Sequence, residues 1–284
     1  MNTKYKLSSP VATGLETLLR LDLNAETSLR DDVKDFVDFA DVLTSAHAPT
    51  SVNGNRMNIA ATDRDFRDIS MSVLFDYIDR CAEFPNIRQL NVHYAHKRWV
   101  SDEQTQGQIG DYEIHISSIR ELGDYSAKHD IQIVLENQNS QWKDNSISVE
   151  TPFSEIDWDN QNREAFGMAP EEWIQMCIDA NHENVKLCLD SSHICTYSHR
   201  FPESERENKV FKFLSRPELI DHVHWSDNYL YDNRGRSDSH LPVGKGSLPV
   251  DLHRSIKELD ATLLLEHFYT IEDLEQELDW IDSL

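Results

Sequence analysis

Short apolar segments rich in Val, Ile and Leu alternate along the chain with longer segments in which apolar residues recur every three to four positions. The short segments have the length and composition of buried strands, and the longer ones have the period of amphipathic helices. Eight segments are of the strand type: residues 5–8, 19–23, 42–47, 87–93, 131–136, 185–190, 220–225 and 262–266. The clearest helical segments are residues 66–81, 114–129, 171–180 and 271–284.

This alternation of strand and helix predicts a parallel sheet. Eight such units in 284 residues fit a closed (β/α)8 TIM barrel, as a single domain over residues 1–284, better than an open sheet. A doubly wound sheet would need a glycine-rich phosphate turn after the first strand, and the sequence has none there. The segment 9–18 is short for a crossover helix, and residues 19–23 are themselves compatible with a helix.

Six consecutive predicted strands end on, or just before, a residue type that ligates metals. Burying a charged or imidazole group is costly, and the carboxyl ends of barrel strands meet at one mouth. A mixed set of imidazoles and carboxylates there suits Zn²⁺, Mn²⁺ or Mg²⁺, so we predict a site for divalent metal. The predicted ligands are His47, His93, Glu136, Asp190, His193, His224, Asp238, His240 and Glu266.

Two long insertions follow predicted strands, at residues 137–169 and 226–252, and therefore lie at the same mouth. The second carries Arg234, Arg236 and Lys245, which suit a substrate phosphate or hydroxyl groups, with a solvated loop as the alternative. Trp142 and Trp225 follow strand ends and suit stacking on a sugar ring, with packing in the core as the alternative.

The composition limits the classes of molecule that the protein is expected to bind. With 51 acidic against 27 basic residues the formal net charge is −24, which disfavours general nucleic-acid binding but fits an ordinary acidic cytosolic protein or a high-salt cytoplasm. The absence of a long apolar run or of a secretory signal in residues 1–10 predicts a cytoplasmic protein outside the membrane. The four cysteines have no paired spacing and are expected to be buried free thiols.

The strand-end motifs, taken in order, resemble those of the xylose-isomerase-like TIM barrels. This superfamily includes sugar and sugar-phosphate isomerases and epimerases, and the endonuclease IV type of apurinic-site nuclease (AP endonuclease family 2). The matching pieces are His47-Ala-Pro, Asn91-Val-His93, Val134-Leu-Glu136-Asn137, Leu189-Asp190-Ser-Ser-His193, Val223-His224-Trp-Ser-Asp227-Asn228, Asp238-Ser-His240-Leu-Pro-Val-Gly244-Lys-Gly246 and Leu265-Glu266.

The resemblance to the epimerase branch implies one divalent ion held by Glu136, Asp190, His224 and Glu266. The two glutamates would also act as opposed acid/bases at the carbon next to a carbonyl, with His193 positioning the substrate. The resemblance to the nuclease branch instead implies three zinc ions on nine ligands, and this sequence offers a candidate for each one. His47, His93, Asp238 and His240 would then belong to additional metal sites.

The sequence departs from both branches. The glycine-rich stretch that the nucleases have after Glu136 is replaced by Asn137-Gln-Asn-Ser-Gln-Trp142, and the second glutamate that the epimerases often carry is replaced by Trp142. We therefore expect a metal-dependent isomerase or epimerase of a small sugar or sugar phosphate. The alternatives are a zinc phosphodiesterase, which alone would engage nucleic acid, and a barrel that binds metal or ligand without catalysis. The sequence leaves a homo-oligomer open.

Overall fold

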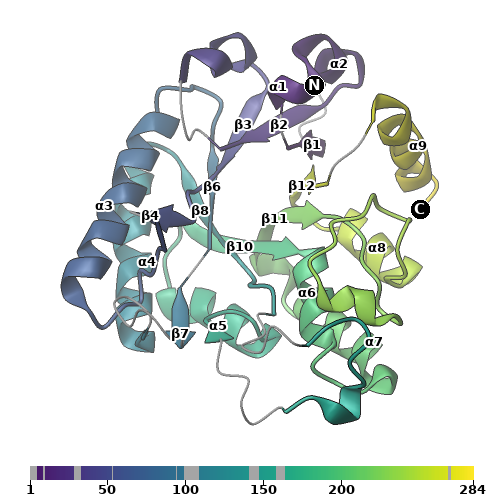
Figure 1. Cartoon of the computed structure of the whole chain (residues 1–284). Helices are drawn as coiled ribbons and strands as arrows, with labels where there is room; N and C mark the ends of the chain where they lie inside the picture. The colour runs from purple at the N-terminus through teal and green to yellow at the C-terminus, as the bar shows by residue number, and fades with distance from the viewer. Residues whose placement is uncertain are drawn as a thin grey trace.

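The computed structural model describes residues 5–8, 10–28, 33–52, 54–93, 95–98, 109–140, 147–157, 164–267 and 270–284. Within these residues, eight parallel strands form a closed barrel in which β1 pairs with both β2 and β12 (Figure 1). This confirms the predicted (β/α)8 architecture. In barrel order the strands are β1 (Tyr5–Leu7), β2 (Asn24–Thr27), β3 (Leu43–His47), β6 (Gln89–Val92), β8 (Gln132–Glu136), β10 (Val185–Asp190), β11 (Ile220–Trp225) and β12 (Thr262–Leu265).

Helices surround the barrel, and the predicted helical segments are confirmed to within a few residues (Figure 1). Asp63, Asp111 and Thr270 each cap a helix by accepting a backbone N–H of its first turn. The α-helices are α1 (Pro10–Thr13), α2 (Leu15–Arg20), α3 (Arg64–Cys81), α4 (Tyr112–Ala127), α5 (Pro170–Ala180), α6 (Ser191–Ser198), α7 (Glu203–Phe211), α8 (Val250–Lys257) and α9 (Ile271–Asp282).

Short elements decorate the loops. A two-stranded hairpin joins β4 (Ser51–Val52) to β5 (Asn55–Arg56), and β7 (His96–Arg98) pairs with β9 (Glu164–Ala165). The 3-10 turns are η1 (Val33–Phe39), η2 (Phe153–Glu155), η4 (Lys212–Leu214), η5 (Pro217–Leu219) and η6 (Asn233–Arg236).

The second strand lies later in the chain than predicted. Residues 19–23 are the end of α2 and the turn after it, where Leu18 is buried but Leu19 is exposed, and the strand itself is Asn24–Thr27. All four residues of β2 are buried, although three of them are polar. The prediction of a strand at 19–23 was wrong because β2 has few apolar residues, and its buried polar groups are satisfied inside the barrel.

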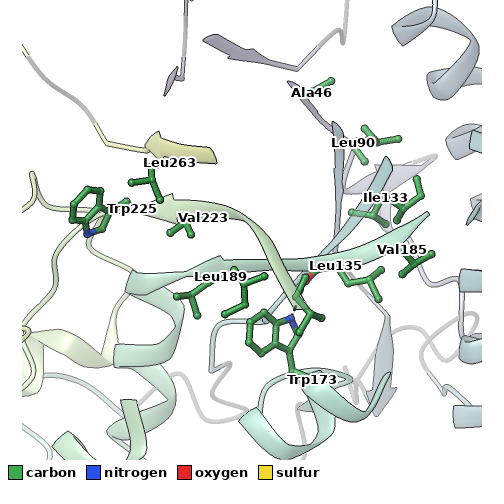
Figure 2. Close-up of a cluster of buried hydrophobic side chains, with 14 of the residues drawn as sticks. Ala46, Leu90, Ile133, Leu135, Trp173, Val185, Leu189, Val223, Trp225 and Leu263 are labelled. Carbon is green, nitrogen blue, oxygen red and sulfur yellow. Dashed lines mark hydrogen bonds between the residues drawn. The ribbon is translucent and has the colours of Figure 1, made fainter. Parts of the chain in front are cut away.

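Side chains alternate across the barrel wall, as the period of two in a strand requires. Those that point outward are apolar and pack beneath the helices; Figure 2 shows Ile133, Leu135, Val223 and Leu263 among them, with the indole N–H of Trp173 donating to the Leu135 carbonyl at 2.8 Å. The alternate residues of the same strands point into the barrel and are largely polar. This arrangement explains why, in the sequence, the strands are apolar segments with polar residues at their carboxyl ends.

The four cysteines are buried and free, as predicted. Among the helices that the structure describes, none has the length and apolar character needed to cross a membrane.

Candidate metal centre

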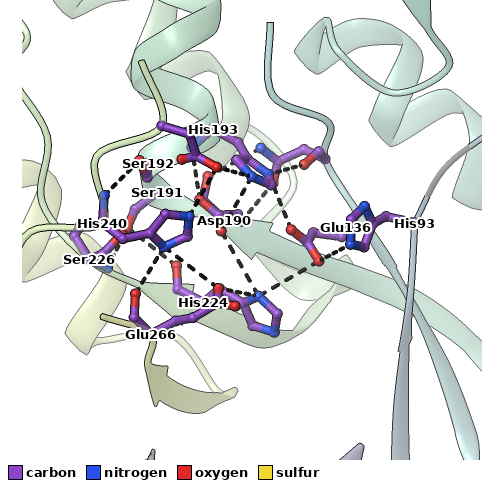
Figure 3. Close-up of polar contacts among 12 residues, drawn as sticks. His93, Glu136, Asp190, Ser191, Ser192, His193, His224, Ser226, His240 and Glu266 are labelled. Carbon is purple, nitrogen blue, oxygen red and sulfur yellow. Dashed lines mark hydrogen bonds and ion pairs between the residues drawn. The ribbon is translucent and has the colours of Figure 1, made fainter. Parts of the chain in front are cut away.

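Imidazoles and carboxylates from six neighbouring strands meet at the carboxyl end of the barrel (Figure 3). Asp190 is the last residue of β10 and lies directly beside His224 in the register of β10 and β11. Glu136 ends β8 on one side of this pair, and Glu266 follows β12 on the other. The order of the strands therefore places Asp190 and His224 between two glutamates.

The central group is formed by these four residues. Nδ1 of His224 lies 2.8 Å from Oε2 of Glu266, 3.6 Å from Oε2 of Glu136 and 3.9 Å from Oδ2 of Asp190. Ligand atoms of Glu136, Asp190 and His224 all lie within 4.8 Å of one another. Three carboxylates thus lie around one ring nitrogen, at separations like those between the ligands of a single cation.

A second group lies on the β3 and β6 side of Glu136. Nε2 of His47 and Nε2 of His93 are 3.1 Å apart and lie 3.8 and 3.9 Å from Oε2 of Glu136. The side-chain amide of Asn91 also donates to this glutamate oxygen. Glu136 therefore borders both this group and the central one, as a bridging carboxylate would.

A third group is built on the first turn of α6 and the loop after β11. Oδ2 of Asp238 lies 3.0 Å from Nε2 of His193 and 3.0 Å from Nε2 of His240. His240 has a φ of 41°, a left-handed conformation that costs energy in a residue other than glycine and often marks a functional position. The structure thus brings together all nine ligands that the sequence predicts.

Backbone carbonyls orient three of these histidines. Nδ1 of His47 donates to the Ala48 carbonyl at 2.8 Å, and Nδ1 of His193 donates to the Asn137 carbonyl at 2.8 Å. Nδ1 of His240 donates to the Glu266 carbonyl at 2.9 Å. Because a carbonyl only accepts, these bonds place the hydrogen on Nδ1 and leave the Nε2 lone pair directed at the carboxylates. Such outer contacts are typical of metal-binding histidines.

The loop that carries Asp238 and His240 is organised around Asp227. Its Oδ1 accepts the backbone N–H groups of Asn228 and Leu248, and its Oδ2 accepts those of Gly244 and Gly246, at 2.8 to 3.1 Å. A Cβ on Gly246 would lie 2.4 Å from Asp227 Oδ1, so only glycine permits this close approach. The Gly-Lys-Gly motif therefore shapes the edge of the site.

Burial and mutual contact shift the acidities within the site. Burial raises the pKa of Asp190 to about 6 and lowers that of His93 to about 3. Burial also opposes protonation of His240, but Asp238, Asp190 and Glu266 outweigh it and raise its pKa to about 10. The crowded acids thus favour either bound protons or a bound cation.

The residues present fit a divalent cation. Oδ2 of Asp190 is buried and, among the residues that the structure describes, has no hydrogen-bond partner, which is costly unless another group satisfies it. The donors are oxygen and imidazole nitrogen, the set that suits Zn²⁺, Mn²⁺ or Mg²⁺. Glu136, Asp190, His224 and Glu266 would hold a primary ion, and the two other groups are candidates for further ions.

One functional candidate, Glu26, does not figure in the sequence-based prediction. It lies on β2, is 4% exposed, and faces His224 and His222 across the barrel. Burial opposes its ionisation, but His224 and His222 hold its pKa well below the usual range. The signal in the sequence is an acid inside a four-residue buried strand, which is visible only once β2 is placed correctly.

Three of the five predicted substrate-binding residues contact other groups of the protein. Trp225 is fully buried and donates to Nδ1 of His253 at 3.0 Å, so it belongs to the core and its predicted stacking on a sugar was wrong. Arg236 is buried and donates to the carbonyls of Ser148 and Thr151. Arg234 is exposed, pairs with Asp232, and covers the ring of Tyr229. Lys245 is exposed, and Trp142 lies outside the described residues.

The profile of the xylose isomerase-like TIM barrel family matches residues 12–284, so the chain belongs to that family. Among proteins with curated functions, none matches the sequence.

Solved structures share the fold from end to end. A D-tagatose 3-epimerase-like protein has 18% identity and a TM-score of 0.67, covering 99% of this chain and 98% of its own. The IolI protein, crystallised with a zinc atom, has 14% identity and a TM-score of 0.66 over 99% and 98%. A D-psicose 3-epimerase, crystallised in the presence of D-fructose, has 12% identity and a TM-score of 0.61 over 99% and 97%.

Proposed function

We propose that the protein is a divalent-metal-dependent isomerase or epimerase of a small sugar or sugar phosphate, acting by proton transfer next to a carbonyl. The observation that carries the proposal is the pair of glutamates, Glu136 and Glu266, that flank Asp190 and His224 from two sides of the barrel mouth. Two carboxylates on either side of one ligand group suit removal of a proton from one face of a carbon and its return. Epimerases among the structural neighbours agree with this class of reaction.

A bound cation would polarise the carbonyl and hydroxyl oxygens of the sugar and so acidify the adjacent C–H. The two glutamates differ in how open they are to a substrate. The side chain of Glu266 is 27% exposed, whereas that of Glu136 is 2% exposed and receives the Asn91 amide. Glu266 is therefore the better placed to take the proton, and Glu136 the better held as a ligand. His193, at the start of α6, would orient substrate hydroxyls.

A second candidate function is a zinc phosphodiesterase of the endonuclease IV type. The specific observation in its favour is that both additional ligand groups, one with His47 and His93 and the other with Asp238 and His240, have converging ring nitrogens. A multinuclear site suits the binding of phosphodiester oxygens. Nucleic acid would be a partner only under this second function.

The test combines metal content with two assays on the same metal-loaded preparation. We expect one tightly held ion per chain, together with incorporation of deuterium from solvent at the carbon next to the carbonyl in a panel of ketoses and their phosphates. Three zinc ions per chain with cleavage of an abasic-site oligonucleotide, and no deuterium incorporation, would replace this proposal with the second.

The matched variant is Glu266→Gln, which keeps the shape of the side chain but removes its ability to take a proton. We expect the deuterium incorporation rate to fall by about 10² to 10⁴-fold, the usual contribution of a positioned general base. Incorporation at the wild-type rate would exclude Glu266 as the base.

A further inference from the structure

His224 differs from its neighbours in what its outer ring nitrogen faces. His47, His193 and His240 each donate one N–H to a backbone carbonyl. His224 instead has Nε2 at 3.1 Å from Oε1 of Glu26, while its Nδ1 faces the three carboxylates of the central group. The ring is fully buried between these two acidic surroundings.

Glu26 is held in place by a chain of polar groups inside the barrel. Ser45 donates to its Oε2 at 2.7 Å, and Nε2 of His222 lies 3.0 Å from the same oxygen. The other ring nitrogen of His222, Nδ1, contacts Thr262 Oγ1 at 2.7 Å, and the Thr262 hydroxyl donates to the side-chain oxygen of Gln89 at 2.8 Å. These residues come from five strands, so the position of the Glu26 carboxylate is set by the barrel as a whole.

We propose that Glu26 is a positioning residue for the metal centre. It keeps the hydrogen of His224 on Nε2, so that the lone pair of Nδ1 is directed at Glu136, Asp190 and Glu266. A carboxylate in this place also makes the imidazole a stronger ligand than a carbonyl would. The inference rests on the proposed function only in that a metal ion binds the central group; it does not depend on the substrate.

Alternatively, some of the same residues could bind a metal ion further inside the barrel than the central group. Ligand atoms of Cys188, His222 and His224 lie within 4.8 Å of one another on the Glu26 side of the ring. Such an ion would require Nε2 of His224 and would make Cys188 a ligand, whereas the positioning role of Glu26 needs nothing from the thiol. Cys188 therefore separates the two arrangements.

The experiment measures the affinity for Zn²⁺ and for Mn²⁺ by competition with a chromophoric chelator, on metal-free full-length protein. We expect Glu26→Gln to weaken binding by about 10 to 100-fold, the usual effect of losing an outer-sphere partner of a ligating histidine. Circular dichroism and the melting temperature of the metal-free variant show that it is folded. The ¹⁵N shifts of the His224 ring, which report the tautomer, should change in zinc-loaded Glu26→Gln and not in the zinc-loaded controls.

Two matched controls accompany this variant. Glu277→Gln makes the same change in another buried glutamate, on α9, which pairs with His267 at 2.7 Å and accepts the Val243 N–H, a bond that the amide oxygen of glutamine can keep. Cys188→Ser removes the thiol. Both variants should bind metal within about 2-fold of wild type. Unchanged affinity in Glu26→Gln, or an equal loss in Glu277→Gln, would overturn the inference. A large loss in Cys188→Ser would replace it with the deeper ion. Failure of the wild type itself to bind either metal would refute the proposed function and this inference together.

Discussion

Two buried aspartates, Asp190 at the barrel mouth and Asp227 in the loop after β11, face opposite surroundings. Both are at most 1% exposed. Asp227 receives four backbone N–H groups, two on each oxygen. Asp190 receives one, from His193 on Oδ1, and among the described residues its Oδ2 has no hydrogen-bond partner, although His193 and His224 lie within 4 Å.

The difference teaches how a structural carboxylate is distinguished from a ligand inside one molecule. Four converging N–H groups stabilise the charge of Asp227, and Nε2 of His253 also lies 3.4 Å from its Oδ2. Oδ2 of Asp190 receives too few hydrogen bonds to stabilise a buried negative charge, and a cation held by Asp190 and the imidazoles around it would supply that stabilisation. Charge and burial are nearly the same in the two residues, so the number of donors that point at each oxygen is the informative quantity.

The largest expected effect concerns Asp190→Asn. We expect metal affinity to fall by more than about 100-fold, the upper figure for losing a mere supporting contact of a ligand. The stability of the metal-free protein should change by no more than about 1 kcal/mol, because the variant removes a charge that burial disfavours. Urea unfolding with and without a chelator measures both. A chelator should destabilise the wild type and leave Asp190→Asn unchanged.

Asp227→Asn should show the reverse pattern. Its amide would face the N–H groups of Gly244 and Gly246, leaving buried donors unsatisfied at a cost of about 3 kcal/mol. Metal affinity per folded molecule should stay within a few-fold of wild type. Urea unfolding of the metal-free protein is the measurement, and a variant as stable as wild type would break the distinction drawn between the two aspartates.

A smaller effect is expected at His115, a buried histidine outside the three ligand groups. His115 on α4 packs against Phe166, with ring centroids 5.0 Å apart, and burial lowers its pKa to about 3. The unfolded chain, with an ordinary histidine pKa of about 6.5, binds a proton that the folded chain excludes, so stability falls as pH drops from about 6.5 towards 3. His115→Gln should make this decline shallower by up to about 1.4 kcal/mol per pH unit, as urea unfolding at pH 4 to 7 would show; an unchanged slope would contradict it.

The barrel, and the imidazoles and carboxylates that meet at its mouth, were predictable from sequence because apolar outward-facing residues mark the strands and polar inward-facing residues end them. Leu187-Cys-Leu-Asp190 shows both signals within four residues. The Asn-Ala-Glu-Thr strand β2 shows neither, because its polar residues are buried against polar groups from distant strands. Glu26 and His222 are 196 positions apart, and no local pattern relates them.

The roles of the loop residues were beyond prediction for a different reason. Trp225 follows the inward-facing His224, and only its outward direction places it against His253 rather than at the mouth. Arg236 is a basic residue in a site loop, but its guanidinium is used to hold the carbonyls of Ser148 and Thr151 in another loop. Both outcomes depend on partners supplied by the folded chain, and the residue type alone does not reveal them.

Closure of the barrel pairs β1, its first strand in the chain, with β12, its last. Glu266 follows β12, so the central ligand group is complete only when the last strand of the barrel has been synthesised. Earlier segments can form helices and pair strands, but they cannot assemble Glu136, Asp190, His224 and Glu266 around one ion. Metal binding at this group would therefore follow synthesis of the last barrel strand, and an occupied centre would indicate that the barrel has closed.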